Sequence, residues 1–168
     1  MNTEPKNPYI KRNFYSSSSQ KEEKCRVFRL ESYSQIESVI SDDNISPLLP
    51  CSDSKRNLKD YAIGKNIIDT SRLNNFLFFN DDKGEIGVQA GITIQEITDL
   101  ILAKGWALPV MPVNLKTSVG AALAANIYGK NHFNEGCFAN HVKSFNLRTA
   151  DGSVINCSVG ENPEYFWS

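Results

Sequence analysis

The order of apolar and polar positions along the chain predicts short strands and helices interspersed with one another. The segment 25–30 (CRVFRL) alternates in character and predicts a strand, and Ile36, Val39 and Ile40 then recur at helical spacing. The segment 66–91 reads as three short strands separated by turns, of which the DDKG turn is the tightest. Because these elements follow no regular βαβ repeat, the predicted fold class is α+β.

The segment 94–104 gives the clearest helix prediction. Thr93 can cap this helix, and Glu96 follows three residues later, which is the spacing of a capping box. Gly105 is expected to end it. One face of the helix is apolar and consists of Ile94, Ile97, Leu100 and Ile101.

The remaining segments predict a strand, a helix and a hairpin. The segment 106–112 (WALPVMP) predicts a strand that leads into a loop, and 117–133 (TSVGAALAANIYGKNHF) predicts a helix of small residues. The segment 142–158 reads as a hairpin with Asp151-Gly152 as a two-residue turn. Pro163 then occupies the first position of a helix that has barely begun when the sequence stops, which predicts a C-terminally truncated domain.

Composition and charge narrow the class of protein. The 168 residues are 40% apolar and 22% charged, which is typical of one globular domain with its own core. Residues 1–24 are polar and predict a flexible tail, and residues 25–168 form the domain. The net charge is −1 and no basic run is interleaved with aromatic residues, so nucleic acid is not an expected partner. We expect a cytoplasmic chain with no membrane span and no signal peptide.

The common nucleotide and metal motifs do not occur. The sequence has neither a Walker loop nor the G-x-G-x-x-G pattern of dinucleotide-binding folds. The four cysteines are far apart and include no C-x-x-C pair, and we expect them to be free thiols. The spacing of His132, Cys137 and His141 matches no metal signature, so no metal site is predicted.

The segment 117–133 leaves two interpretations open. Ser118 or Thr117 can cap a helix whose first turn consists of small residues, and unpaired N–H groups at such an end favour a phosphate or a carbonyl-rich ring. The other interpretation is ordinary packing, because alanine and glycine also permit a helix to lie close to its neighbours. Residue types alone do not choose between the two.

Two longer stretches resemble a known family. The segment 109–152, PVMPVNLKTSVGAALAANIYGKNHFNEGCFANHVKSFNLRTADG, with the trailing ENPEYFW, resembles the FAD-binding domain of vanillyl-alcohol-oxidase-type (PCMH-type) flavoproteins. It is most similar to the branch of FAD-linked sugar oxidases related to decaprenylphosphoryl-β-D-ribose 2′-oxidase. The segment 66–97 fits the strand–turn–strand–helix of the same family, and the resemblance extends over about 25–167.

The resemblance implies an α+β domain of two small α/β subdomains that hold FAD between them, beside a separate substrate domain. In such enzymes a hydride passes from a sugar carbon to the flavin N5. The backbone of 118–120 is expected to lie against the FAD, the stretch 125–129 to approach the flavin, and 129–132 (GKNH) to brace the site. The implied cofactor-binding residues are Ser118, Val119, Gly120, Ala125, Ile127, Gly129, Lys130 and Asn131.

The sequence also departs from the family pattern. The first FAD loop of the family is rich in glycine, and its backbone amides cradle the diphosphate, whereas Cys51–Asp60 (CSDSKRNLKD) has no glycine. In that loop Asp53 would repel a diphosphate, and Lys55 and Arg56 would attract it. Within the second motif Val113 and Ala121 replace glycines, and Tyr128 replaces a histidine near the flavin.

Two functional hypotheses follow. In the first, the chain is the FAD-binding domain of an FAD-dependent oxidoreductase, and a second chain supplies the missing C-terminal part and the substrate domain. In the second, it is a degenerate or split remnant that keeps the fold without FAD and acts as an interaction module. The 168 residues alone are not expected to form a complete active site.

Overall fold

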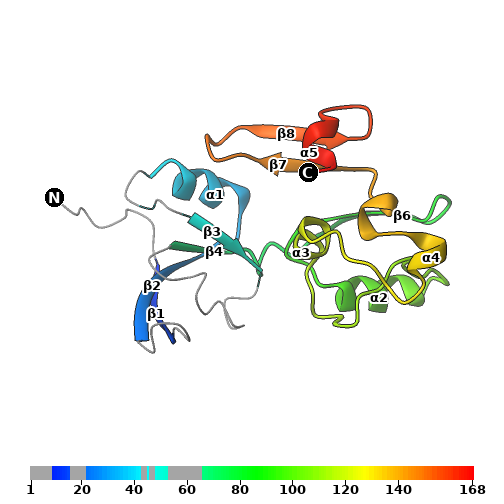
Figure 1. The fold of residues 1–168 in the computed structure, drawn as a ribbon, viewed down its shortest axis with the longest axis horizontal. Coiled ribbons are helices and arrows are strands. Elements are labelled where there is room, and N and C mark those ends of the chain that lie inside the picture. Colours follow the sequence, from blue (N-terminus) through cyan, green and yellow to red (C-terminus); the bar gives the residue numbers. More distant parts are fainter. Residues whose placement is uncertain (1–8, 16–21, 43–44, 46–47, 53–65) are drawn as a thin grey trace. The chain divides into compact units, whose positions relative to one another are not determined.

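A computed structural model of the protein describes residues 9–15, 22–42, 45, 48–52 and 66–168 (Figure 1). The chain forms two compact units, Met1–Leu73 and Asn74–Ser168, which we name the N-terminal unit and the C-terminal unit. Both units contain strands and helices, and no single βαβ pattern repeats through them. The α+β class predicted from the sequence is therefore confirmed.

The N-terminal unit is built on a four-stranded sheet with the order β1-β2-β4-β3. Its elements are β1 (Ile10–Tyr15), β2 (Glu22–Arg29), α1 (Tyr33–Ile40), β3 (Leu48–Cys51) and β4 (Asn66–Asp69). Strand β1 is antiparallel to β2, whereas β2, β4 and β3 are parallel to one another. Their last residues, Arg29, Asp69 and Cys51, are aligned in register, so all three strands end at one edge of the sheet, which we name the carboxyl edge.

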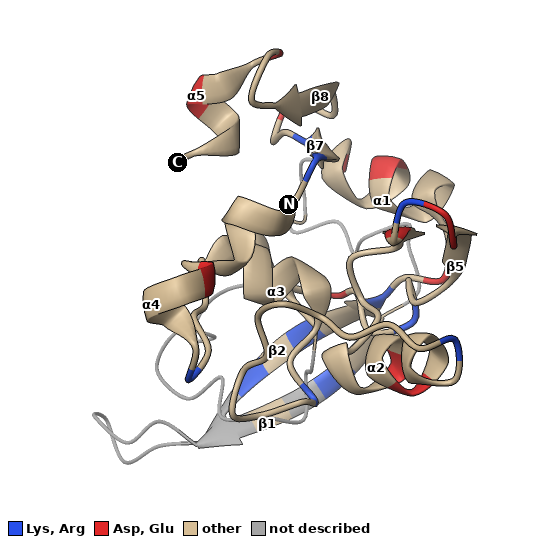
Figure 2. Ribbon diagram, turned by 90° about the vertical axis from the view of Figure 1, so that its right-hand side faces the viewer, with Lys and Arg blue, Asp and Glu red and all other residues tan. Residues whose placement is uncertain are grey.

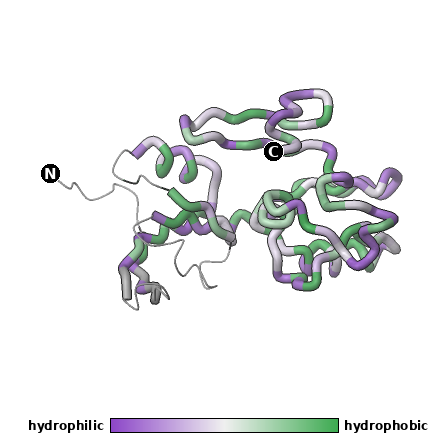
Figure 3. The backbone as a smooth tube through the Cα atoms, in the orientation of Figure 1, coloured by the Kyte–Doolittle hydropathy of each residue, from purple (hydrophilic) through white to green (hydrophobic). Residues whose placement is uncertain are grey.

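Buried apolar side chains lie on both faces of this sheet. Successive residues of a strand point to opposite faces, and Val27 and Ile67 lie in one core cluster while Phe28 and Ile68 lie in another. All four residues of β4 are buried, as expected of a central parallel strand. Hydrophobic stretches are found along the backbone of both units (Figure 3). The larger cluster contains Phe28, Leu30, Val39, Ile45, Ile68 and Leu73.

Part of the predicted flexible tail is a strand. Residues 10–15 form β1, and β2 already begins at Glu22, so the prediction of an unstructured segment 1–24 is wrong for these residues. The pairing of β1 with β2 is a backbone interaction, and a polar edge strand gives no hydrophobic period by which a sequence could predict it. The other residues of the predicted tail, 1–8 and 16–21, lie outside the described part of the chain.

The C-terminal unit contains two hairpins and several short helices. The first hairpin is antiparallel and pairs β5 with β6, and the second pairs β7 with β8. The elements in chain order are β5 (Phe76–Asn80), β6 (Glu85–Val88), α2 (Ile94–Leu102), α3 (Val119–Ala124), α4 (His132–Glu135), the 3-10 helix η3 (Phe138–His141), β7 (Ser144–Arg148), β8 (Val154–Ser158) and α5 (Pro163–Phe166). The strands and helix predicted between residues 66 and 102 are therefore present.

Helix α2 has the ends that its sequence predicts. The hydroxyl of Thr93 accepts the N–H of Glu96 at 3.2 Å, and the Glu96 carboxylate accepts the N–H of Thr93 at 2.8 Å, which completes the capping box. The helix ends at Leu102, two residues before the predicted end, and Gly105 follows with φ of +82°. Its buried residues are Ile94, Ile97, Thr98 and Ile101.

The segment 106–112 forms no strand, which corrects the sequence prediction. Pro109 and Pro112 have no N–H to donate to a ladder, and two such positions within seven residues disfavour a paired strand here. The segment is nevertheless fixed in place, because Val110 is buried in the core of the C-terminal unit.

The turn of the second hairpin is longer than predicted. The last strand pair is Arg148 with Val154, and the N–H of Thr149 donates to the carbonyl of Ser153 at 3.0 Å. The N–H of Gly152 in turn donates to the carbonyl of Thr149 at 3.0 Å, and Gly152 has φ of +86°. The connection is therefore a three-residue loop with its glycine in the left-handed region, and not a two-residue turn at Asp151-Gly152.

Candidate functional site

The first turn of α3 uses its backbone donors within the protein. Ser118 caps the helix and is buried, and its hydroxyl accepts the N–H of Ala121 at 3.2 Å. The N–H of Val119 donates to the carbonyl of Ile92 at 2.8 Å. These donors are the ones that the sequence analysis expected to be unpaired and open to a ligand, and for them that expectation is wrong.

The backbone N–H of Gly120 is also paired within the protein. Its N–H donates to the carbonyl of Ala90 at 2.8 Å. A Cβ added to Gly120 would lie 3.1 Å from both the Cβ and the carbonyl oxygen of Ala90, which is tighter than most real contacts. The glycine is therefore explained by the close approach of α3 to the segment before α2, and the packing interpretation of the small residues applies here.

The stretch after α3 is held by several backbone contacts. Ala125 ends the helix and is exposed, and Ile127 both donates to the carbonyl of Ala122 at 3.1 Å and accepts the N–H of Phe138 at 2.8 Å. Between them Asn126 has φ of +39°, and its side-chain oxygen accepts the N–H of Ala139 at 3.2 Å. Sequence reasoning assigned Asn126 no role, although asparagine tolerates positive φ better than most residues.

Gly129 and Asn131 fasten the GKNH segment to the proline-rich segment before it. The side-chain amide of Asn131 donates to the carbonyl of Pro109 at 2.7 Å. A Cβ on Gly129 would lie 3.0 Å from the carbonyl oxygen of Met111, so this position also requires a close backbone approach. Lys130 between them is exposed. Asn131 therefore braces the local backbone.

An exposed group of three rings borders the same segment. Tyr128 is 68% exposed, and its ring meets that of His132 edge to face with centroids 5.3 Å apart. His132 contacts Phe133 in the same manner, and the Phe133 side chain is 98% exposed. Val113, which stands in place of a family glycine, is also almost fully exposed. Apolar surface is therefore available next to the residues that the resemblance assigns to the cofactor.

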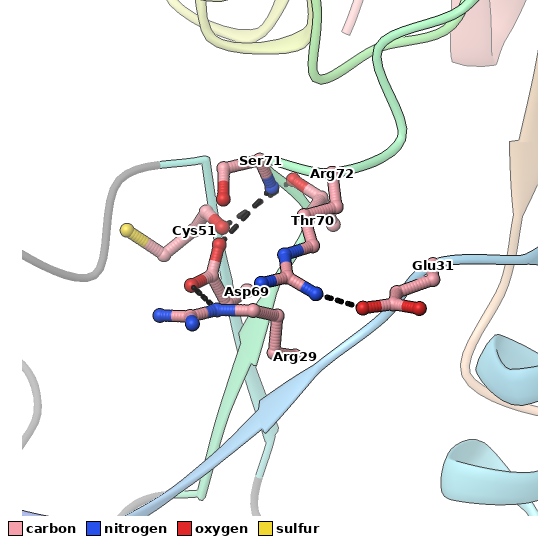
Figure 4. Close-up of polar contacts among 7 residues, drawn as sticks. All are labelled: Arg29, Glu31, Cys51, Asp69, Thr70, Ser71 and Arg72. Atoms are coloured by element: carbon pink, nitrogen blue, oxygen red, sulfur yellow. Dashed lines mark hydrogen bonds and ion pairs between the residues drawn. The ribbon is translucent and has the colours of Figure 1, made fainter.

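In the N-terminal unit, the structure describes only the start of the predicted first FAD loop. Cys51 and Ser52 are described, whereas residues 53–60, with Asp53, Lys55 and Arg56, lie outside the described part of the chain. Cys51 is anchored, because its carbonyl accepts the N–H of Thr70 at 2.8 Å and the Thr70 hydroxyl at 3.3 Å (Figure 4). The root of the loop is thus joined to the turn that follows β4.

Asp69 organises that turn. Its carboxylate is buried, accepts the N–H of Ser71 at 3.0 Å through Oδ1, and pairs with Nε of Arg29 at 3.2 Å through Oδ2 (Figure 4). Arg72 forms a separate, exposed ion pair with Glu31. This turn, residues 69–74 (DTSRLN), lies within the segment 66–97 that fits the family, but no role was predicted for its side chains. The sequence does contain a signal for the role of Asp69, because this aspartate directly follows two apolar strand residues, Ile67 and Ile68.

The described residues offer few other groups that could bind a metal ion or act as a nucleophile. No group of three His, Cys, Asp or Glu side chains there is placed to hold a metal ion. Burial, and then the nearby Glu164 and Glu161, raise the pKa of the Cys157 thiol, which disfavours the reactive thiolate.

Acidic and basic residues are interspersed along the ribbon (Figure 2). Across the described ranges, every helix is too short or too polar to cross a membrane.

Comparison with known proteins gives a family and a sequence relative. The family model described as FAD binding domain matches residues 26–158. The chain is 33% identical over 103 residues to the decaprenylphosphoryl-beta-D-ribose oxidase of Mycolicibacterium smegmatis, and this match covers 61% of the chain and 22% of the relative. The matched stretch therefore spans less than a quarter of the length of that relative.

Solved structures share the fold. The chitooligosaccharide oxidase structure superposes with a TM-score of 0.69 at 15% identity, covering 84% of this chain and 31% of its own. The structure of 6-hydroxy-D-nicotine oxidase from Arthrobacter nicotinovorans superposes with a TM-score of 0.70 at 20% identity, covering 84% and 32%. At such identities the superpositions establish a common fold, in which this chain corresponds to about a third of each larger protein.

Proposed function

The chain belongs to the family of FAD binding domains, and on that premise we propose that it binds FAD as part of an FAD-linked oxidoreductase resembling sugar oxidases. The observation that carries the proposal is the family match over residues 26–158, which includes both the DTSRLN turn and the segment 117–133. The chemistry that bound FAD supplies in such an enzyme is acceptance of a hydride from a sugar carbon.

In this proposal the residues that the resemblance assigns to the cofactor contribute mainly the shape of the binding surface. Because the donors at the start of α3 are already paired, Ser118, Val119 and Gly120 would offer a closely packed surface and not a set of free amides. Ala125, Ile127 and Gly129 would let the flavin approach the backbone. The exposed Lys130 adds a positive charge there, and Asn131 holds the segment in position.

The remainder of the enzyme would come from further polypeptide. Since the match covers 22% of this relative, we propose that a second chain provides the substrate-binding part in the cytoplasm. The second hairpin and the residues after it expose apolar side chains on which such a chain can pack. These side chains are Val154, Val159, Tyr165 and Trp167.

A remnant that keeps the fold without FAD is the second candidate function. The observations that favour it are the paired donors of α3 and the absence of glycine from Cys51–Asp60. The first leaves those amides unavailable to a diphosphate, and the second disfavours the positive φ angles and the close backbone approach that a glycine-rich loop allows. Such a chain would act only through its surface, as an interaction module.

A visible absorption spectrum of the purified chain separates the two candidates. The FAD-binding domain is expected to show flavin bands at close to one equivalent per chain after gel filtration. A colourless protein with the circular dichroism of a folded α+β chain, and no flavin uptake on dialysis against FAD, would support the remnant.

A further inference from the structure

The carboxyl edge of the N-terminal sheet gathers the polar groups of three parallel strands. Arg29 ends β2, Asp69 ends β4 and Cys51 ends β3, and the register places Asp69 opposite both of the others. In sheets with parallel strands, ligands bind outside the carboxyl ends of the strands, where the connections leave the sheet. This edge is therefore where a ligand of the N-terminal unit is expected.

Arg29 is held at this edge by one of its three guanidinium nitrogens. Its Nε donates to Oδ2 of Asp69 at 3.2 Å, and the N–H of Ser71 occupies the other oxygen of that carboxylate. No acceptor from the described part of the chain bonds to Nη1 or Nη2 of Arg29. The Asp69 side chain is 1% exposed and that of Arg29 is 25% exposed, so of this pair it is the arginine that reaches solvent.

We propose that Arg29 is an anion-binding residue and that its ligand is the diphosphate of FAD. The inference rests on the proposed function, and it assigns to a side chain a contact that the family makes through the backbone of a glycine-rich loop, whereas Cys51–Asp60 has no glycine. A guanidinium is always charged and presents paired N–H groups that match phosphate oxygens. Asp69 is a positioning residue, because it fixes the guanidinium and does not itself face the ligand.

The anchoring of Cys51 places the site at the root of the loop that the resemblance assigns to the diphosphate. Thr70 follows Asp69 directly and holds the Cys51 carbonyl through both its N–H and its hydroxyl (Figure 4). The turn that positions Arg29 is therefore the same turn that fixes the start of Cys51–Asp60. The turn that begins at the buried Asp69 carboxylate thus lies next to both Arg29 and the start of the loop Cys51–Asp60.

The same strand provides a matched control. Arg26 also lies on β2, and its Nε donates to the side-chain oxygen of Asn66 at 2.7 Å, its register partner on β4. This pair resembles the Arg29–Asp69 pair in geometry but lies at the beginning of β4 and not at the carboxyl edge. Substitution of Arg26 by glutamine removes the same charge from the same strand.

The experiment measures FAD and riboflavin affinities by titration for the full chain and its variants. Because Arg29→Gln alone would leave Asp69 buried without its partner, the main variant combines Arg29→Gln with Asp69→Asn, which keeps a neutral pair. We expect FAD to bind this variant about tenfold to a hundredfold more weakly, since a charged hydrogen bond to phosphate is lost. Riboflavin, which has no phosphate, should bind as it does to the unmodified chain. Arg26→Gln should change neither affinity.

Inorganic diphosphate provides a readout that is independent of flavin. It should raise the melting temperature of the unmodified chain and of Arg26→Gln but not that of the double variant. Equal FAD affinity in the double variant, or an equal loss with Arg26→Gln, would overturn the assignment of Arg29. If the unmodified chain binds diphosphate through Arg29 but does not bind FAD, the proposed function fails and the anion site stands. If it binds neither ligand, both fail.

Discussion

Gly120 is constrained on two sides, by the hydrogen bond from its N–H to the Ala90 carbonyl and by the Ala90 methyl group that faces its Cα. Sequence reasoning identified Ser118 as a cap and Gly120 as a place where something must come close. It could not identify what comes close, because the partners belong to a segment about 30 residues earlier. The N–H and Cα of the position predicted to lie against the FAD are therefore packed against Ala90.

A methyl group at Gly120 should destabilise the C-terminal unit. Gly120→Ala is expected to cost about 1–3 kcal/mol of unfolding free energy, because the added Cβ overpacks the contact with Ala90. Both tryptophans, Trp106 and Trp167, lie in this unit, so chemical denaturation followed by their fluorescence measures it.

Gly160→Ala is the matched control, because a Cβ at Gly160 meets open space. It should leave the free energy of unfolding unchanged or slightly higher. Adding Ala90→Gly to Gly120→Ala should recover part of the loss, since it removes one of the two close contacts. Equal stability of Gly120→Ala and the unmodified chain would show that this glycine is not a packing requirement.

At the scale of the element, a helix or strand could be predicted when the residues that cause it lie within the segment itself. Helix α2 could be predicted with its cap and its buried face because the period and the Thr93–Glu96 spacing lie within the segment itself. Strand β1 could not, since it depends on backbone pairing that a sequence pattern does not display. The segment 106–112 was wrongly predicted as a strand although its two prolines, Pro109 and Pro112, are visible in the sequence and argue against one. The hairpin loop at Gly152 was located correctly, but its length depends on which residues close the ladder.

The capping box of α2 gives a pH-dependent prediction. Partial burial raises the pKa of the Glu96 carboxyl, but hydrogen bonds from the Thr93 hydroxyl and N–H and from the Asn74 amide outweigh it, so that the pKa lies below its ordinary value of 4.5. A carboxyl with a lowered pKa stabilises the fold above its ordinary pKa, and this contribution is lost as the pH falls through the folded-state value. The cap is therefore strongest near neutral pH.

Thr93→Ala should cost about 1 kcal/mol at pH 7, because it removes the cap hydroxyl and one hydrogen bond to Glu96. The cost should become smaller below pH 4.5, where Glu96 begins to protonate. Denaturation curves at several pH values test this, with Thr117→Ala as the control. Thr117 lies at the neighbouring cap, where Ser118 and not Thr117 binds the helix N–H. A cost that stayed constant with pH would exclude the contribution of Glu96.

At the scale of the whole molecule, the family and the α+β fold could be predicted from the sequence, and the cofactor contacts could not. The motif 109–152 carries the family resemblance, and the match over residues 26–158 confirms it. The contacts depend on which backbone donors remain unpaired after folding, and the structure shows that those at the start of α3 do not. Because the first-turn amides of α3 are paired within the protein, we propose that a side chain, Arg29, contributes to binding the diphosphate.

Calorimetric titration of the purified, folded chain with FAD tests the central claim most directly. The account predicts saturable binding with one FAD per chain, and weaker binding at high salt because an arginine contacts the diphosphate. A chain that unfolds cooperatively, and so is folded at the start, but takes up no FAD at any concentration would contradict the account.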